Sequence, residues 1–408
     1  MQKNTGIRPE VKFPLILIHT PYGLKFFDKV AKTSFGKIYA KFNIYLMPII
    51  TALALFLIVS SLFIMVSNVS AREGVKGIGP QANLLIPGLN PYLPITYGLA
   101  ALFVTIVIHE AGHGIVARVY NVRVDSTGVV LFAIFPIGAF VNIERDELDK
   151  ISLKQKSAIL TAGPLNNMIL AFFSLGLLYL VVSSLTPIDG IERKDIGINI
   201  LTVNENSLAN SIGLTPDSVL TSINGQDIDD IEKLGQLLRS NLGNTIEITW
   251  TSSDDVEFVK QVQLPNSVPE NQGILGVTIS NLSPDPSLVL DRYKSAFSIN
   301  PLAILLPPTL SQGSVPYSDL MSPNYESNLF GPSYPILANF LFWIWFINFN
   351  VGIFNALPIG PLDGGQLYGS LLERKSSRNK SSILKPSTLL TIGMIVVIAL
   401  SLALPWII

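Results

Sequence analysis

Five long apolar runs restrict what this 408-residue chain can fold into. They cover residues 44–66, 93–120, 158–185, 334–357 and 389–408. A helix needs about 20 apolar residues to cross the hydrocarbon core of a bilayer, where every backbone polar group must find its partner within the protein. We therefore predict a polytopic α-helical membrane protein with about five transmembrane spans.

Composition agrees with a membrane protein and limits its partners. Charged residues make up 14% of the chain, whereas about 25% is usual for soluble domains. A formal net charge of −1 provides no basic face for nucleic acid, and we expect no nucleic-acid partner. Because the chain has no cysteine, any metal must bind through nitrogen and oxygen atoms.

Lysine and arginine cluster on one predicted side of the membrane. Residues 1–43 form a basic arm with eight of them, and the loops after the second span and before the last span are also basic. Because cytoplasmic loops carry the excess of Lys and Arg, we place the N-terminus and both loops in the cytoplasm. We expect an integral protein of a prokaryotic plasma membrane, with residues 190–282 outside the cytoplasm.

The second apolar run contains two of the three histidines. His109 and His113 are four residues apart, so both imidazoles lie on one face of a helix, with Glu110 beside them. Ionisable groups at membrane depth are costly, and they are usually functional. The two histidines can bind one metal ion while Glu110 acts as a general base towards water. The alternative is that the histidines only pack helices together, with Glu110 as their partner.

A second constellation follows the fourth run, in the sequence Asn355-Ala-Leu-Pro-Ile-Gly-Pro-Leu-Asp363-Gly-Gly. Its prolines and glycines break the helix, which is tolerated at membrane depth only beside protein or a water-filled cavity. The carboxylate of Asp363 completes a set of two histidines and one carboxylate, which leaves a fourth zinc position for water. The alternative is that Asp363 merely caps the short helix that follows.

A third constellation, Ala-Gly-Pro-Leu-Asn-Asn over residues 162–167, lies early in the third span. Small residues allow close helix packing, and a buried amide such as that of Asn167 can bond across helices or hold a substrate carbonyl. Pure packing is the alternative for Asn167. This constellation and the histidines lie about 15 Å below the cytoplasmic boundary. The fourth span runs from the outside towards the cytoplasm and places Asp363 in the same layer. All three constellations can therefore meet.

Residues 126–143 form one further apolar run, which contains Pro136 and Gly138. β-Branched and aromatic residues flank the Pro-Ile-Gly sequence, which favours a β-hairpin with its turn there, dipping into the membrane. A true crossing would place Asp363 on the opposite side of the membrane from His113. We therefore predict a re-entrant hairpin.

Together these motifs resemble the site-2 protease family of intramembrane zinc metalloproteases, peptidase family M50. The resemblance covers residues 93–372. It implies that His109, His113 and Asp363 bind one catalytic Zn²⁺ ion and that Glu110 is the catalytic base. Asn167 matches the family's motif asparagine, which helps to position the substrate or the oxyanion. The hairpin resembles the family's re-entrant β element near the active site.

The implied activity is hydrolysis of peptide bonds within or near transmembrane segments of membrane-protein substrates, in regulated intramembrane proteolysis. The metalloprotease core would consist of residues 93–185 and 334–372, with the last span within residues 386–408. The implied partners are membrane proteins with a transmembrane helix and the lipid bilayer itself. Four further residues are expected to position the substrate: Asn355, Pro358, Gly138 and Phe140.

A polar insert separates the third and fourth spans. Its strands and helices are expected at residues 197–203, 207–214, 218–225, 228–238, 245–251, 257–264 and 274–279. This order is similar to PDZ domains of the permuted bacterial type, which implies an extracytoplasmic α+β domain over residues 190–282 and a linker over residues 283–333. Such modules bind peptide ends or strands, including those of substrate ectodomains. The alternative interpretation, a steric filter that recognises no specific sequence, is equally compatible with the sequence.

Two other classes of function compete with a protease. The first is a catalytically silent membrane receptor or scaffold that binds a ligand through the PDZ-like insert. The chain keeps every group that the chemistry requires, which argues against this class. The second is a transporter with a metal site at the bilayer midplane, which would show paired broken helices or internal repeats. The sequence has one broken helix and no repeat.

Overall fold

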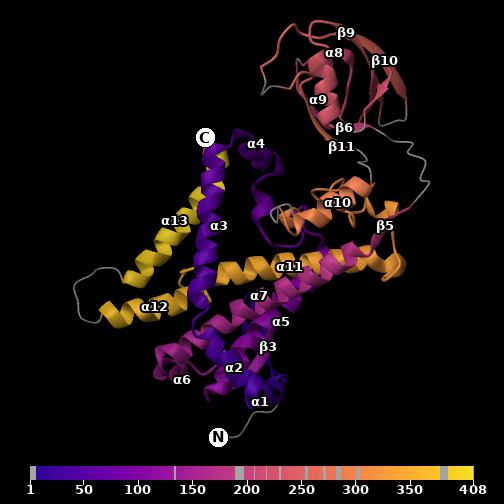
Figure 1. Ribbon diagram of the computed structural model, residues 1–408. Helices are drawn as coiled ribbons and strands as arrows, with labels where there is room; N and C mark the ends of the chain where they lie inside the picture. Colours follow the sequence, from indigo (N-terminus) through magenta and orange to yellow (C-terminus); the bar gives the residue numbers. More distant parts are fainter. Residues whose placement is uncertain are drawn as a thin grey trace. The chain divides into compact units, whose positions relative to one another are not determined.

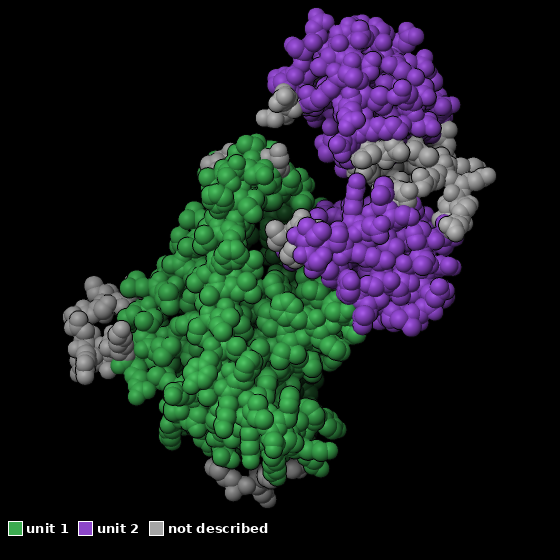
Figure 2. All heavy atoms as spheres, viewed as in Figure 1, with its two compact units in different colours: residues 1–177, 340–408 green, residues 178–339 purple. Residues whose placement is uncertain are grey.

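The computed structural model describes residues 6–132, 135–188, 197–205, 207–216, 218–228, 231–252, 256–269, 273–281, 286–299, 304–376 and 385–407. Two compact units make up the chain (Figure 2): the first contains residues 1–177 and 340–408, and the second contains residues 178–339. The first unit carries the three constellations, and the second carries the polar insert.

Five helices in the described part of the chain are long and apolar enough to cross a membrane (Figure 1). They are α3 (Met47–Ser67), α5 (Ile95–Val119), α7 (Leu153–Ser183), α11 (Tyr334–Asn355) and α13 (Pro386–Ile407). The five apolar runs therefore form helices as predicted, and the chain is a polytopic membrane protein. A short helix, α4 (Val69–Ile78), follows α3.

Small and polar residues join the spanning helices of the first unit. At Gly112, α5 lies so close to α7 that a Cβ would overlap the carbonyl oxygen of Ala162. Asn348 on α11 donates a hydrogen bond of 2.8 Å to the hydroxyl of Thr105 on α5. Both side chains are buried, so this bond pairs polar groups that would otherwise lie unsatisfied among apolar helices. These contacts hold the helix that carries the histidines.

The basic arm is folded. Its elements are β1 (Arg8–Lys12), β2 (Leu15–Thr20), α1 (Leu24–Ala31) and α2 (Ser34–Asn43). The inner face of α1 packs on α5, where a Cβ on Gly114 would overlap the ring of Phe27. Sequence patterns did not indicate this folding, because the apolar stretches of the arm are short. None of them has the length of a membrane-spanning helix.

The arm extends the predicted hairpin into a four-stranded antiparallel sheet of order β1-β2-β3-β4. The hairpin strands are β3 (Val124–Phe132) and β4 (Phe135–Ile143). His19 on β2 links three strands, because its Nδ1 lies 2.9 Å from the Ser126 hydroxyl and its Nε2 lies 3.0 Å from a carboxylate oxygen of Glu10. The third histidine therefore has a structural place within this sheet.

The turn of the hairpin differs from the prediction. Pro136 and Gly138 lie inside β4, and the two residues between β3 and β4 lie outside the described ranges. The register shifts between Val130 and Leu131, so Ile137 is an extra residue in β4. Such a bulge accommodates a proline, which has no N–H to donate to the ladder. The Pro-Ile-Gly sequence is therefore a bulge and not a turn.

The second unit contains a six-stranded sheet, in which β10-β9-β7-β6-β11 are neighbours and β8 pairs with β7. Its elements are β6 (Ile198–Val203), α8 (Leu208–Ile212), β7 (Val219–Ile223), β8 (Gln226–Asp227), α9 (Ile231–Ser240), β9 (Thr245–Thr251), β10 (Glu257–Gln263) and β11 (Val277–Asn281). Buried side chains that include Leu220, Ile248 and Trp250 form its own core. Strands and helices lie close to the positions expected from the sequence of the insert.

The segment predicted as a linker contains regular structure. α10 (Pro286–Ala296) lies within it, and β12 (Tyr325–Ser327) pairs with β5 (Leu185–Pro187) at the end of α7. Its residues 283–285 and 300–303 lie outside the described ranges. In the first unit, the remaining helices are α6 (Arg145–Lys150) and α12 (Asp363–Ser376).

Candidate metal centre

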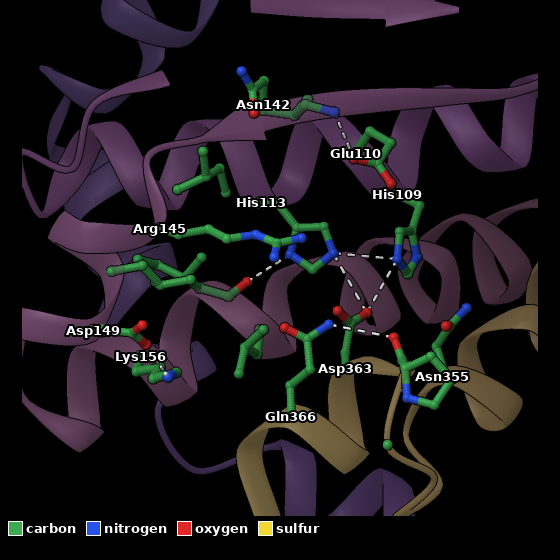
Figure 3. A pocket seen from close by; sticks show the side chains of 17 residues that line it. His109, Glu110, His113, Asn142, Arg145, Asp149, Lys156, Asn355, Asp363 and Gln366 are labelled. Carbon is green, nitrogen blue, oxygen red and sulfur yellow. Dashed lines mark hydrogen bonds and ion pairs between the residues drawn. The ribbon is translucent and has the colours of Figure 1, made fainter. Parts of the chain in front are cut away.

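Three buried side chains meet in the first unit (Figure 3). His109 and His113 come from α5, and Asp363 is the first residue of α12. The Nε2 atoms of the two histidines are 3.2 Å apart, and Oδ2 of Asp363 lies 3.1 Å from the first and 3.4 Å from the second. Together these residues form a group that could hold a metal ion.

The partner behind His113 sets which nitrogen of its ring carries the proton. Nδ1 lies 2.7 Å from the carbonyl oxygen of Ile159, and a carbonyl oxygen can only accept a hydrogen bond. Nδ1 is therefore protonated in the neutral ring. As a result, Nε2 of His113 presents a lone pair towards Asp363 and His109.

The amide of Asn167, on α7, lies 2.9 Å from Nδ1 of His109. With the amide nitrogen facing the ring, Oδ1 of Asn167 is buried without a hydrogen-bond partner. The two ends of an amide have nearly the same shape, and their assignment follows from the hydrogen bonds that they make. If Oδ1 faces the ring, it accepts a hydrogen bond from Nδ1–H of His109. Nε2 of His109 then also presents a lone pair.

The three donor groups fit a metal ion. Their ligand atoms all lie within 4.8 Å of one another, and Oδ2 of Asp363 is buried without a hydrogen-bond partner among the described residues. Burying a carboxylate in this way is costly unless a cation compensates it. Two imidazoles and a carboxylate are also a ligand set of catalytic zinc sites. Gly163 leaves the space free, because a Cβ there would overlap Nε2 of both histidines.

Two glycines allow the chain to bring Asp363 back to α5. α11 ends at Asn355, and the ring of Pro358 cannot fit into a continuing helix. A Cβ on Gly364 or on Gly365 would overlap carbonyl oxygens of the broken segment. The first turn of α12 therefore packs on that segment only because both positions lack a side chain. This packing directs the carboxylate of Asp363 to the histidines.

A cavity of about 720 Å³ opens beside the three metal-facing side chains. Glu110 lines it, and its Oε2 accepts a hydrogen bond of 2.8 Å from the backbone N–H of Val141 on β4. Polar and charged side chains complete much of the lining: Asn142, Arg145, Asp149, Lys156, Asn355 and Gln366. The predicted base thus borders the same cavity as the histidines, in contact with a strand of the sheet (Figure 3).

The four residues predicted to position substrate lie in different places. Asn355 lines the cavity, whereas Pro358 is buried in the broken segment and is not part of the lining. Gly138 and Phe140 lie on β4 and do not line the cavity either. Residues 141–143 of the same strand do line it. The part of β4 that lines the cavity therefore begins directly after Phe140.

Sequence reasoning missed Tyr39 on α2. Its hydroxyl donates a hydrogen bond of 2.6 Å to Oδ1 of Asn166 and lies 3.2 Å from the carbonyl oxygen of Ala162. Burial raises the pKa of Tyr39, so the hydroxyl keeps its proton. Asn166 in turn donates to the carbonyl oxygen of Ile108, the residue before His109. The available signal was an aromatic hydroxyl on the inner face of a short amphipathic helix.

Comparison with known proteins identifies relatives of similar length. An uncharacterized protein from Methanocaldococcus jannaschii is 24% identical over 374 residues, which cover 92% of this chain and 82% of the relative. A protein of Nostoc sp. named as a candidate zinc metalloprotease is 24% identical over 333 residues, which cover 69% of this chain and 86% of the relative. The regulator of sigma E protease from Haemophilus influenzae is 24% identical over 228 residues, with 48% and 49% covered.

A family model covers most of the chain. The model for peptidase family M50 matches residues 97–400. This region includes both metal-facing histidines, Glu110, Asn167 and Asp363. The buried donor set lies within the matched region, on or next to helices of membrane-spanning length. The chain belongs to peptidase family M50.

Proposed function

We propose that this protein is a zinc metalloprotease that hydrolyses peptide bonds within or near transmembrane segments of membrane-protein substrates, in regulated intramembrane proteolysis. The observation that carries the proposal is the buried cluster of His109, His113 and Asp363, because α5 is long and apolar enough to span a membrane. Membership of peptidase family M50 supports the class of reaction, as do the protease names of two relatives.

His109, His113 and Asp363 would hold the zinc ion through the two Nε2 atoms and Oδ2. When bound there, zinc supplies Lewis-acid chemistry, which acidifies water towards neutral pH and polarises a peptide carbonyl. Asn167 and the carbonyl oxygen of Ile159 hold the two rings from behind. Their hydrogen bonds keep both Nε2 lone pairs directed at the same point.

Glu110 is the general base and then the general acid of the proposed reaction. Its carboxylate takes a proton from water while the oxygen of that water attacks the carbonyl carbon of the scissile bond. The carboxyl group then gives the proton to the leaving nitrogen as the C–N bond breaks, so the products are a carboxyl group and an amine. For the first step, Glu110 must exchange its hydrogen bond with Val141 for one with water.

β4 offers a place for an unwound substrate segment. Residues 141–143 line the cavity, and among the described strands β4 pairs only with β3. No described strand pairs with its other edge, and the N–H of Val141 donates to Glu110. A transmembrane helix hides its peptide bonds in hydrogen bonds and must unwind locally before hydrolysis. An open strand edge can receive such a segment by β-addition. We assign the hairpin as a re-entrant element, with Asn355 as a polar contact for the substrate.

We assign the insert as a PDZ-like domain that lies outside the cytoplasm. Its chain order, β6-α8-β7-β8-α9-β9-β10-β11, supports this assignment. The domain would bind a peptide strand of the substrate or exclude bulky ectodomains from the protease core. The proposed location is a prokaryotic plasma membrane, with the N-terminus on the cytoplasmic side and the metal centre nearer to that side.

A membrane-embedded reporter tests the proposed function in proteoliposomes. Glu110→Gln should lower the cleavage rate by about 10²–10⁴-fold, because an amide cannot take the proton from water. Glu73→Gln on α4, a change at an exposed ion pair with Lys76, should cleave as fast as wild type. A Glu110→Gln protein that cleaves the reporter at the wild-type rate would rule out Glu110 as the general base and, with it, the proposed mechanism.

A further inference from the structure

The outer face of α2 carries an apolar stripe. Phe35, Ile38 and Phe42 follow one another at helical spacing of three and four residues, and Tyr45 extends the stripe into the following turn. Their exposed fractions are 71%, 67%, 61% and 65%, respectively. Nothing in the part of the chain that the structure describes covers these side chains. Such a contiguous apolar surface normally marks a site of interaction.

The inner face of α2 fixes the direction of the stripe. Gly36, Ala40 and Asn43 are buried, and a Cβ on Gly36 would overlap the carbonyl oxygen of Val30 at the end of α1. On the same face, Tyr39 is tied to α7 through its hydrogen bond with Asn166. α2 therefore cannot turn its stripe towards the protein interior without losing these contacts.

Further exposed aromatic side chains lie before α2. Phe26 on α1, Tyr22 before it and Phe13 between β1 and β2 are all exposed. Phe27, the neighbour of Phe26, is buried against α5, so α1 also has one face packed on the protein and another directed outwards. Exposed aromatic side chains are therefore present on all elements of the arm, on the strand pair as well as on α1 and α2.

Exposed basic side chains lie on the same two helices as the apolar side chains. The lysines of α1, α2 and their connection are all exposed, namely Lys25, Lys29, Lys32, Lys37 and Lys41. None of them forms an ion pair within the described part of the chain. Residues 1–46 contain eight Lys and Arg but only two acidic residues, Glu10 and Asp28, a net charge of +6. The whole chain has a net charge of −1, so this segment is strongly basic by contrast.

We propose that α1 and α2 form an interfacial anchor that binds the anionic phospholipid headgroups of one membrane leaflet. Continuity with the bilayer supports this occupant, because α2 ends at Asn43 and the spanning helix α3 begins at Met47. The aromatic side chains enter the boundary between headgroups and acyl chains, where amphipathic helices lie. The lysines extend along the same surface and place their ammonium groups near lipid phosphates.

The absence of cysteine makes the depth of α2 directly measurable, because each introduced cysteine is unique. Full-length Ile38→Cys and Phe42→Cys proteins, spin-labelled in phosphatidylcholine–phosphatidylglycerol vesicles, should collide more often with oxygen than with a water-soluble nickel chelate. Lys37→Cys and Lys41→Cys on the same helix are matched controls, and their labels should collide mainly with nickel. Labels at positions 38 and 42 that behave like those controls would overturn the proposal. So would labels shielded from both reagents, because protein would then cover the stripe.

Lipid selectivity tests the charge component separately. Spin-labelled phosphatidylglycerol should associate with the wild-type protein severalfold more than spin-labelled phosphatidylcholine does, and high salt should reduce this preference. Replacing the five lysines together with glutamine should remove most of it. Equal association of the two lipids with the wild-type protein at low salt would refute anionic headgroup binding, whether or not the glutamine variant folds.

Discussion

The side-chain amide of Asn167 on α7 lies 2.9 Å from Nδ1 of the metal-facing His109. The resemblance to site-2 proteases implied a role for Asn167 in positioning the substrate or the oxyanion. In the structure its amide lies behind the ring, on Nδ1, at the far side from Asp363. A hydrogen bond at that place orients a metal ligand and sets its tautomer. We therefore interpret Asn167 as a positioning residue for His109.

Replacement of Asn167 should weaken zinc binding. Asn167→Ala is expected to lower the affinity about 10–100-fold, the usual effect of losing a partner behind a ligating histidine. Asn167→Asp should restore most of the affinity, because a carboxylate accepts from Nδ1–H of His109. Competition with a chromophoric chelator measures both. Unchanged affinity in Asn167→Ala, or no rescue by Asn167→Asp, would contradict this interpretation.

At the residue scale, the sequence identified the groups whose presence in an apolar segment is costly. The sequence predicted three of these groups, His109, His113 and Asp363. The spacing of the histidines and the helix break before Asp363 favoured a functional role over a purely structural one. Tyr39 was not predictable, because its hydroxyl meets residues 123 and 127 positions away in the chain. Such a contact depends on how helices pack, and a single aromatic residue does not report it.

At the scale of elements, the close approach of α5 and α7 shapes the metal centre. Gly112 on α5 lies against the backbone of α7, and Gly163 on α7 lies against the two histidine rings of α5. Small residues at such crossings allow helix backbones to approach closely in a membrane. The third constellation therefore shapes the metal centre in two ways. Gly163 leaves room for the histidine rings, and the asparagine amides form hydrogen bonds.

A methyl group at position 163 should disturb the metal centre. Gly163→Ala is expected to displace the Nε2 atoms of both histidines, to cost about 1–3 kcal/mol of unfolding free energy through overpacking, and to reduce bound zinc. Gly176→Ala on the same helix has open space around its Cβ and should raise the unfolding free energy by about 1 kcal/mol. Thermal unfolding and metal content measure both. Wild-type zinc content in Gly163→Ala would contradict the packing account.

The hairpin illustrates how far patterns predict elements. Its apolar, β-branched composition indicated two strands at residues 126–143, and β3 and β4 lie there. The turn was misplaced because Pro136 and Gly138 favour turns locally, whereas the pairing with β3 makes them part of a bulge. The addition of β2 to β3 was also missed, since it pairs Thr20 with Thr127 across a long stretch of chain.

At the scale of the whole molecule, the insert has a core separate from the metal centre. Its buried side chains belong to residues 198–275, and the metal-facing residues belong to the other unit. The strands of the insert could be predicted from the alternation of apolar and polar residues, because one face of each strand packs on this core. Trp250 is the largest fully buried side chain of that core.

The separation of the two cores predicts separable effects of mutation. Trp250→Ala should lower the unfolding free energy of the insert by about 3–5 kcal/mol, because it leaves a cavity in the core, while zinc content stays at the wild-type level. Leu201→Ala, at an exposed position of the same sheet, should have little effect on either quantity. Limited proteolysis of the insert and metal analysis measure the two effects. Loss of zinc in Trp250→Ala would show that the cores are not independent.

Counting zinc ions in the purified full-length protein tests the central claim, that two histidines of α5 and the carboxylate of α12 form one metal centre. We predict about one zinc ion per wild-type chain and almost none in Asp363→Asn, because the amide is a poor replacement for the carboxylate ligand. Asp319→Asn, an exposed change in the second unit, should keep the wild-type amount. Full zinc occupancy in Asp363→Asn would contradict the claim.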